Sequence, residues 1–191
     1  MSRDPDFDAD LAAYGGWRAL AREQSLWAVW LYRAGRRLDR RPPGAARRWL
    51  ARLYWPLFRL VETVTGVSLP KGAEIGPGLR IWHFGGIFIN ESARIGARCV
   101  LRQGVTLGNR HPDGPSPWLG DDVEIGAYAQ ILGGVRVGHG ARIGAMAVVL
   151  QDVPDGASAV GNPARVIAAR GVRPSAAITA DGGLPPPESA A

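Results

Sequence analysis

The chain has little cysteine, no long apolar run and no basic, apolar start. Its 191 residues include a single cysteine, Cys99, which excludes an internal disulfide framework and is typical of a reducing compartment. No stretch reaches the roughly 18 apolar residues that a membrane-spanning helix needs. Residues 1–10 are acidic, so they predict no secretory leader. These absences favour a cytoplasmic protein in which Cys99 is a buried structural thiol and not a nucleophile, because no partner that would lower its pKa is in view.

Positive charge is concentrated near the start of the chain. Of a net charge of +6, residues 1–68 carry most, with 12 arginines against 7 acidic residues, and nine of these arginines lie between Arg33 and Arg59. Two interpretations stay open: solvated helix faces with a basic linker, or a surface that meets anionic lipid or a polyanionic substrate. No nucleic-acid module accompanies the charge, so we expect no nucleic-acid partner.

Residues 8–66 have apolar spacing that predicts helices. Ser25 is a candidate N-cap of a second helix, Arg40–Gly44 breaks that helix, and a third begins at about Ala45. At helical spacing, tryptophan is typical of a core or of a contact between subunits, and a membrane-interface anchor is the alternative. Five of the seven tryptophans lie in this region: Trp17, Trp27, Trp30, Trp49 and Trp55.

From Leu69 to Ile167 an apolar residue recurs every six positions. The clearest run is Leu119, Ile125, Ile131, Val137, Ile143 and Val149. A period of six fits neither a helix nor ordinary hairpins, but it fits a solenoid in which short strands turn sharply and stack coil upon coil. We therefore divide the chain into a helical region, residues 1–68, a β-solenoid, residues 69–167, and a flexible C-terminal tail, residues 168–191, which is rich in Ala, Pro and Gly.

The repeat is interrupted twice, and each interruption contains a histidine. Two extra residues enter around Trp82–Gly86, which includes His83, and a polar loop at Gly108–Pro117, which includes His111, replaces one apolar position. Histidine is the side chain best suited to accept a proton near neutral pH. The two interruptions are therefore candidate catalytic positions, whereas His139 falls in a regular corner and is expected to be a solvated turn residue.

The repeat and its interruptions resemble a known superfamily. The stretches that carry the resemblance are Ile75–Gly78, His83 with Gly86, Ile87 and Glu91, Gly104–Gly108, Ile125–Ala127, Ile131–Gly133 and Gly161–Ile167. Over residues 69–167 the chain resembles the hexapeptide-repeat acyltransferases, and within them most of all the serine acetyltransferases. The resemblance implies a mainly β protein built on a left-handed parallel β-helix, a homotrimer with each active site between neighbouring subunits, and acetyl-CoA as the donor.

The resemblance also implies roles for particular residues. His83 matches the catalytic histidine, which would take the proton from an acceptor hydroxyl as its oxygen attacks the thioester. The implied substrate-side positions are Trp82, Glu91, Arg110 and His111, and the implied CoA-side positions are Gly108, Ala127 and Ala145. No metal is expected.

Three departures from the family pattern bear on the acceptor. Ser68 stands where the family has the aspartate partner of the catalytic histidine. Trp82 stands where it has an aspartate that helps hold the amino group of serine, and the pair at Arg110 and His111 opens the loop instead of ending it. These changes weaken the recognition of free serine, whereas an indole suits a sugar ring or a larger acceptor. The acceptor stays open between serine and a saccharide or natural-product hydroxyl.

Two alternatives remain beside an O-acetyltransferase with His83 as its base. His111 is a second candidate base, because some sugar and xenobiotic acetyltransferases of the superfamily use a histidine in a loop that leaves the prism. The other alternative is a trimeric β-helix that has lost activity and serves as a binding scaffold. The presence of His83 beside Gly85 and Gly86, and of small residues on the CoA side, counts against that scaffold.

Overall fold

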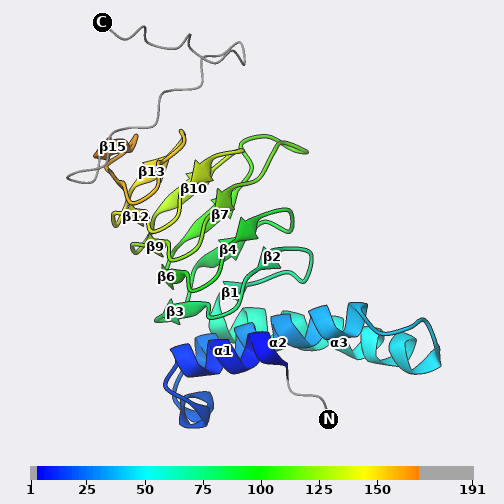
Figure 1. The fold of residues 1–191 in the computed structure, drawn as a ribbon. Coiled ribbons are helices and arrows are strands. Elements are labelled where there is room, and N and C mark those ends of the chain that lie inside the picture. Colours follow the sequence, from blue (N-terminus) through cyan, green and yellow to red (C-terminus); the bar gives the residue numbers. More distant parts are fainter. Residues whose placement is uncertain (1–3, 168–191) are drawn as a thin grey trace, which may run out of the picture.

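The computed structural model describes residues 4–167 as a helical region followed by a β-solenoid (Figure 1). The predicted flexible tail, residues 168–191, lies outside these described residues. The helices lie across one end of the stack of coils, and the chain climbs away from them coil by coil. The helical segments are α1 (Pro5–Ala13), the 3₁₀ helix η1 (Trp17–Ala21), α2 (Gln24–Asp39) and α3 (Ala45–Thr65).

Local signals set several of the helix ends. The Asp4 side chain accepts a hydrogen bond from the Asp6 N–H at 3.1 Å, and Pro5 occupies the first turn of α1. Helix α3 begins at Ala45, as predicted, and ends at Thr65, where Gly66 follows as the C-cap with a φ of 63°. The predicted N-cap role of Ser25 is wrong: α2 begins at Gln24, and the buried Ser25 hydroxyl donates to the Ile81 carbonyl at 3.1 Å. A tertiary hydrogen bond thus replaces the local cap.

The solenoid has three parallel sheets, which the chain visits in the order A, B, C in each coil. Sheet A contains β1 (Val67–Ser68), β4 (Ile87–Ile89), β7 (Thr106–Gly108), β10 (Gln130–Leu132) and β13 (Val148–Val149). Sheet B contains β2 (Glu74–Ile75), β5 (Arg94–Ile95), β8 (Trp118–Leu119) and β11 (Arg136–Val137). Sheet C contains β3 (Arg80–Trp82), β6 (Val100–Arg102), β9 (Glu124–Ile125), β12 (Arg142–Ile143), β14 (Ser158–Val160) and the antiparallel β15 (Arg165–Ile167).

The strand register shows both interruptions of the repeat. In a regular coil the partner of a residue lies eighteen positions further on, as Val148 does for Gln130. Ile81 pairs with Leu101, twenty positions on, so the first interruption adds the two residues that the sequence predicted. Thr106 pairs with Gln130, twenty-four positions on, so the loop lengthens its coil by one whole repeat.

The six-residue repeat forms the core of the solenoid. The six residues of the clearest run, Leu119 to Val149, are each at most 3% exposed. Cys99 is fully buried between coils and its thiol donates to the Gly120 carbonyl at 3.2 Å. The predicted burial of Cys99 is confirmed, and burial raises the pKa of its thiol to about 11, which makes it a poor nucleophile.

A buried ion pair joins the helices to the first coil. The Arg33 guanidinium donates to the Asp10 carboxylate at 2.7 Å and to the carbonyls of Ile75 and Gly76 at 2.7 and 2.6 Å. Asp10 also accepts hydrogen bonds from the backbone N–H groups of Gly78 and Leu79 at 2.8 and 2.9 Å. Backbone groups at the open end of the solenoid are thereby satisfied by α1 and α2.

The five tryptophans of the helical region do not lie in the core of the single chain. They are 37–63% exposed. The core interpretation is therefore wrong, and a subunit contact or a membrane surface remains. No helix within residues 4–167 combines the length and the apolar composition needed to cross a membrane.

Candidate active site

Three edges separate the three sheets, and each edge carries one histidine. The CA edge, where the chain passes from sheet C to sheet A, includes residues 83–86, 103–105, 126–129 and 144–147. The AB edge, where it passes from sheet A to sheet B, includes residues 90–93, 109–117, 133–135 and 150–152. The BC edge, where it passes from sheet B to sheet C, includes residues 76–79, 96–99, 120–123 and 138–141. His83 lies on the CA edge, His111 on the AB edge and His139 on the BC edge. His139 lies in a turn, where its Nδ1 accepts a hydrogen bond from the Asp121 N–H at 2.9 Å, which fits the structural role expected of it.

His83 is exposed in the first corner of the CA edge. Its φ of 64° is left-handed, a conformation that Tyr128 and Met146 share in later corners of this edge. The corner geometry therefore belongs to the solenoid and is not confined to the candidate site. In the part of the chain that the structure describes, the imidazole has no hydrogen-bond partner, and no hydrogen bond joins it to Ser68. It is free to meet a ligand.

Trp82, just before His83, is held in a three-layer stack. The Arg80 guanidinium lies 4.1 Å from the centre of the Trp82 ring and 4.0 Å from that of Tyr14. Arg80 is buried and pairs with Glu23 at 3.4 Å, while the outer indole remains 44% exposed. The residue before His83 is thus a rigid aromatic surface open to solvent.

The helical region fixes this stack from behind. The Tyr14 hydroxyl accepts a hydrogen bond from the Ile81 N–H at 3.1 Å and donates to the Ser25 hydroxyl at 3.2 Å. Burial raises the pKa of Tyr14 to about 12, so the phenol stays protonated at neutral pH. No local sequence pattern indicates Tyr14 or Arg80, since the two residues lie far apart in the chain and meet only in the folded protein.

Two of the predicted CoA-side residues lie on the same edge as His83. The Ala127 carbonyl accepts a hydrogen bond from the Met146 N–H at 2.8 Å, so the corners with Ala127 and Ala145 are neighbours. From His83, the successive corners of this edge pass through Gly104 and Ala127 to Ala145. Three steps between strands at about 4.8 Å each give a row about 14 Å long, which suits an extended ligand.

Tyr128 and Met146 flank this row, although neither was predicted from the sequence as a site residue. They are 54% and 66% exposed. The Tyr128 ring lies over Gly104, where an added Cβ would come within 2.2 Å of the ring. Asp122 has the same left-handed conformation at a corner of another edge. A large aromatic or thioether side chain at such a corner, in place of a short polar one, was the sequence signal that could have indicated Tyr128 and Met146.

The other predicted residues lie on the AB edge. Glu91 is exposed in an early corner, Gly108 ends β7, and Arg110 and His111 begin the long loop. A hollow of about 360 Å³ is lined by Arg110, His111 and Gln151, among others. One chain therefore groups His83, Ala127 and Ala145 on the CA edge, with Trp82 just before that edge at the end of β3. It groups Glu91, Arg110 and His111 on the AB edge, with Gly108 just before that edge at the end of β7.

Arg110 anchors the loop to later coils. Its Nε donates to the Leu132 carbonyl at 3.1 Å, and its Nη2 donates to the Leu150 carbonyl. At the far end of the loop, the Ser116 hydroxyl donates to the Asn90 side chain at 2.9 Å. These bonds hold the loop along the AB edge, so His111 is not brought to His83 within one chain.

The described ranges contain no cluster of three or more His, Cys, Asp or Glu that could hold a metal ion.

Known sequences match most of the chain. The family model for bacterial transferase hexapeptide (six repeats) matches residues 116–151. The serine acetyltransferase of Helicobacter pylori is 37% identical over 168 residues, which cover 83% of this chain and 90% of that protein. The serine acetyltransferase of Synechococcus elongatus is 40% identical over 119 residues, which cover 61% of this chain and 49% of that protein, so the chain spans about half of that relative.

Solved structures agree with the sequence matches. Soybean serine acetyltransferase complexed with serine matches with a TM-score of 0.74 and 34% identity, over 86% of this chain and 70% of that one. A serine acetyltransferase in complex with CoA matches with a TM-score of 0.69 and 31% identity, over 84% of this chain and 68% of that one. These matches confirm the predicted fold, a left-handed parallel β-helix behind a small helical region. By descent and by fold, the chain belongs to the serine acetyltransferase family, which are acyltransferases that use acetyl-CoA as donor.

Proposed function

We propose that this chain is a cytoplasmic O-acetyltransferase that moves the acetyl group of acetyl-CoA to an acceptor hydroxyl, with His83 as the general base. The observation that carries the proposal is the CA edge, where an exposed imidazole without a hydrogen-bond partner in residues 4–167 begins a row of small corner residues. Serine is the acceptor that family membership favours, since relatives across most of this chain's length are serine acetyltransferases.

The chemistry requires one proton acceptor and room for a thioester. His83 accepts the proton of the acceptor hydroxyl while the oxygen bonds to the acetyl carbonyl carbon. The carbon–sulfur bond then breaks, and the imidazolium returns the proton to the sulfur, so that CoA leaves as a thiol. Backbone N–H groups of the corner, or the imidazolium itself, stabilise the negative oxygen between these steps. Ala127 and Ala145 allow the extended arm of the donor to approach the backbone.

Copies of the chain complete the site in this proposal. Strands of sheet A have two or three residues, and at about 3.3 Å per residue they separate the CA and AB edges by about 10 Å before the corners are added. His111 and Glu91 therefore act on the acceptor held at His83 only if the AB edge comes from a neighbouring copy. Such a head-to-tail contact closes into a ring, which agrees with the predicted homotrimer.

The test is thiol release from acetyl-CoA with serine as acceptor. For His83→Ala we expect turnover to fall about 10²- to 10⁴-fold while CoA binding, measured by calorimetry, stays near the wild-type value. His139→Ala is the matched control and should keep full turnover, because His139 lies on the BC edge. Wild-type turnover in His83→Ala, together with loss in His111→Ala, would make His111 the base. Absence of CoA binding by the wild-type chain would favour the inactive scaffold.

A saccharide hydroxyl is the second candidate acceptor, and the Trp82 stack favours it. Sugar rings place their C–H faces on exposed indoles, and this indole is immobilised beside the proposed base by Arg80. A hollow of about 270 Å³ next to it is lined by Trp82, Arg102, Gly126 and Arg142, among others. The arginines there can donate hydrogen bonds to ring hydroxyls.

A further inference from the structure

Helix α3 has an apolar face that no other part of residues 4–167 covers. Trp49, Leu53, Leu60 and Val64 recur at spacings of four and seven, so they share one side of the helix. Their side chains are 63%, 67%, 59% and 55% exposed. Single exposed apolar residues are ordinary, but a contiguous row of this length on a single chain usually marks an interaction surface.

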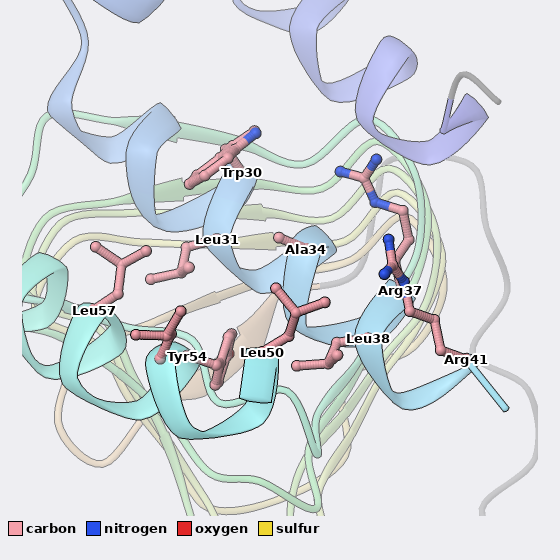
Figure 2. A pocket seen from close by; sticks show the side chains of 10 residues that line it. Trp30, Leu31, Ala34, Arg37, Leu38, Arg41, Leu50, Tyr54 and Leu57 are labelled. Atoms are coloured by element: carbon pink, nitrogen blue, oxygen red, sulfur yellow. The ribbon is translucent and has the colours of Figure 1, made fainter. Parts of the chain in front are cut away.

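A groove beside this row extends the apolar surface to α2. It has a volume of about 390 Å³ and is lined by Trp30, Leu50, Leu53 and Leu57, with Arg37 and Arg41 at one end. Figure 2 looks onto this groove with the coils of the solenoid behind it. In this view the groove lies between α2 and α3. Row and groove together are called the α2–α3 face below.

Arginines without acidic partners lie on α3 and on the turn that joins it to α2. Nearby acidic side chains already have partners: Asp39 pairs with Lys71 at 2.7 Å, and Glu62 pairs with Arg59 at 2.8 Å. Within the described chain, five arginines of α3 and of the turn between α2 and α3 have no acidic partner: Arg40, Arg41, Arg47, Arg48 and Arg52. An apolar, tryptophan-containing surface with an excess of positive charge is complementary to an anionic bilayer.

We propose that the α2–α3 face docks the protein peripherally on an anionic lipid surface. The apolar row enters the boundary between headgroups and acyl chains, and the arginines bind lipid phosphates with their stems alongside. A second copy is the less suitable occupant. A two-fold contact would place the same patch of each copy against the other, and so bring two sets of unpaired arginines together.

The position of the face adds to this inference. The helices lie across one end of the coils (Figure 1), so copies arranged side by side would present their α2–α3 faces at the same end. This step rests on the proposed trimer. Three weak lipid contacts on one rigid particle bind far more tightly than one.

The experiment is co-sedimentation of the full chain with vesicles of phosphatidylcholine alone or of phosphatidylcholine mixed with phosphatidylglycerol. We expect binding to the mixed vesicles, weakened by added salt. Trp49→Ser with Leu53→Ser should lower the affinity at least about tenfold. Arg47→Gln with Arg48→Gln should lower it about fivefold for each arginine.

Matched controls lie on the solenoid. Val160→Ser removes an apolar side chain that is 41% exposed at the other end of the molecule, and Arg94→Gln with Arg136→Gln removes two exposed positive charges on sheet B. Both should bind mixed vesicles like the wild-type chain. Acetyl transfer in solution, which does not depend on lipid, is measured for every variant to establish that it is folded.

Two results would overturn the proposal. One is equal or absent sedimentation of the wild-type chain with the two kinds of vesicle. The other is a halving of particle mass in Trp49→Ser with Leu53→Ser by sedimentation velocity, which would make the α2–α3 face a contact between copies.

Discussion

Trp82 and His83 are adjacent in the chain but are held in different ways. The indole is fixed through Arg80 to Tyr14 of the helical region, whereas the imidazole has no partner among the residues that the structure places. A general base must lie within hydrogen-bond reach of the hydroxyl whose proton it takes, so an imidazole that is open to solvent suits this role. A rigid aromatic beside it can select which acceptor arrives.

Replacement of Trp82 separates the two candidate acceptors. In Trp82→Asp we expect kcat/KM for a saccharide acceptor such as N-acetylglucosamine to fall about five- to tenfold, the typical worth of one aromatic contact. kcat/KM for serine should rise, because a carboxylate would then face its ammonium group. The measurement is the ratio of the two values in a thiol-release assay.

Trp118→Ala is the control for this replacement, since Trp118 also lies against an arginine, Arg136, at 5.1 Å but on sheet B. Its ratio should match that of the wild-type chain. An unchanged ratio in Trp82→Asp would remove the saccharide from consideration.

At this scale the sequence could locate His83 but not its surroundings. The interruption of a strict repeat identifies the position, because two extra residues must leave the coil. Arg80 has no such signal. Its role depends on Tyr14 and Glu23, and these contacts form only after α1 and α2 fold onto the first coil.

Among the elements, the junction of α1 and α2 with the first coil controls the candidate site. Asp10 and Arg33 are nearly inaccessible, and together they satisfy four backbone groups of the coil. Burial raises the pKa of the Asp10 carboxyl, although Arg33 and the two N–H donors act to lower it. Removal of Arg33 would leave a buried carboxylate without its counter-ion.

We expect Arg33→Met to lower the free energy of unfolding by about 3–5 kcal/mol, as measured in urea. Arg59→Met, which breaks the exposed pair with Glu62 on α3, should cost less than about 1 kcal/mol. Without Arg33 the folded-state pKa of Asp10 rises further, so the native state binds the proton more tightly than the unfolded chain does. The stability of Arg33→Met should therefore recover as pH falls toward the ordinary carboxyl range and decline as pH rises. Equal losses in both variants at neutral pH would refute the central role of the junction.

The elements of the solenoid could be predicted and those of the helical region only in outline. A six-residue period fixes strand length, the inward residues and the corners, because each coil repeats the same geometry. The helices follow a weaker pattern. Ser25 looks like a cap in sequence, yet Tyr14 and Ile81 bind its hydroxyl, and the apolar side of α3 gives no indication of whether a partner covers it.

At the scale of the whole molecule, the predicted site residues divide between two edges of one prism. The edge on which a residue lies can be predicted by counting along the repeat, because each six-residue step carries the chain across one edge. It does not tell which edges meet in an assembly, since that depends on the shapes of two surfaces. Because Arg110 anchors the loop along the AB edge, His111 stays apart from His83 within one chain.

The measurement that tests the shared site most directly is complementation between two inactive chains. His83→Ala inactivates the CA edge, and His111→Ala is expected to lose most turnover through the AB edge. The two chains carry different affinity tags and are produced together, and only assemblies with both tags are purified. In a head-to-tail trimer of mixed composition, one of the three contacts joins an intact CA edge to an intact AB edge. The predicted result is acetyl transfer at about one third of the wild-type rate. Mixed assemblies no more active than the two parent proteins would contradict a site shared between copies.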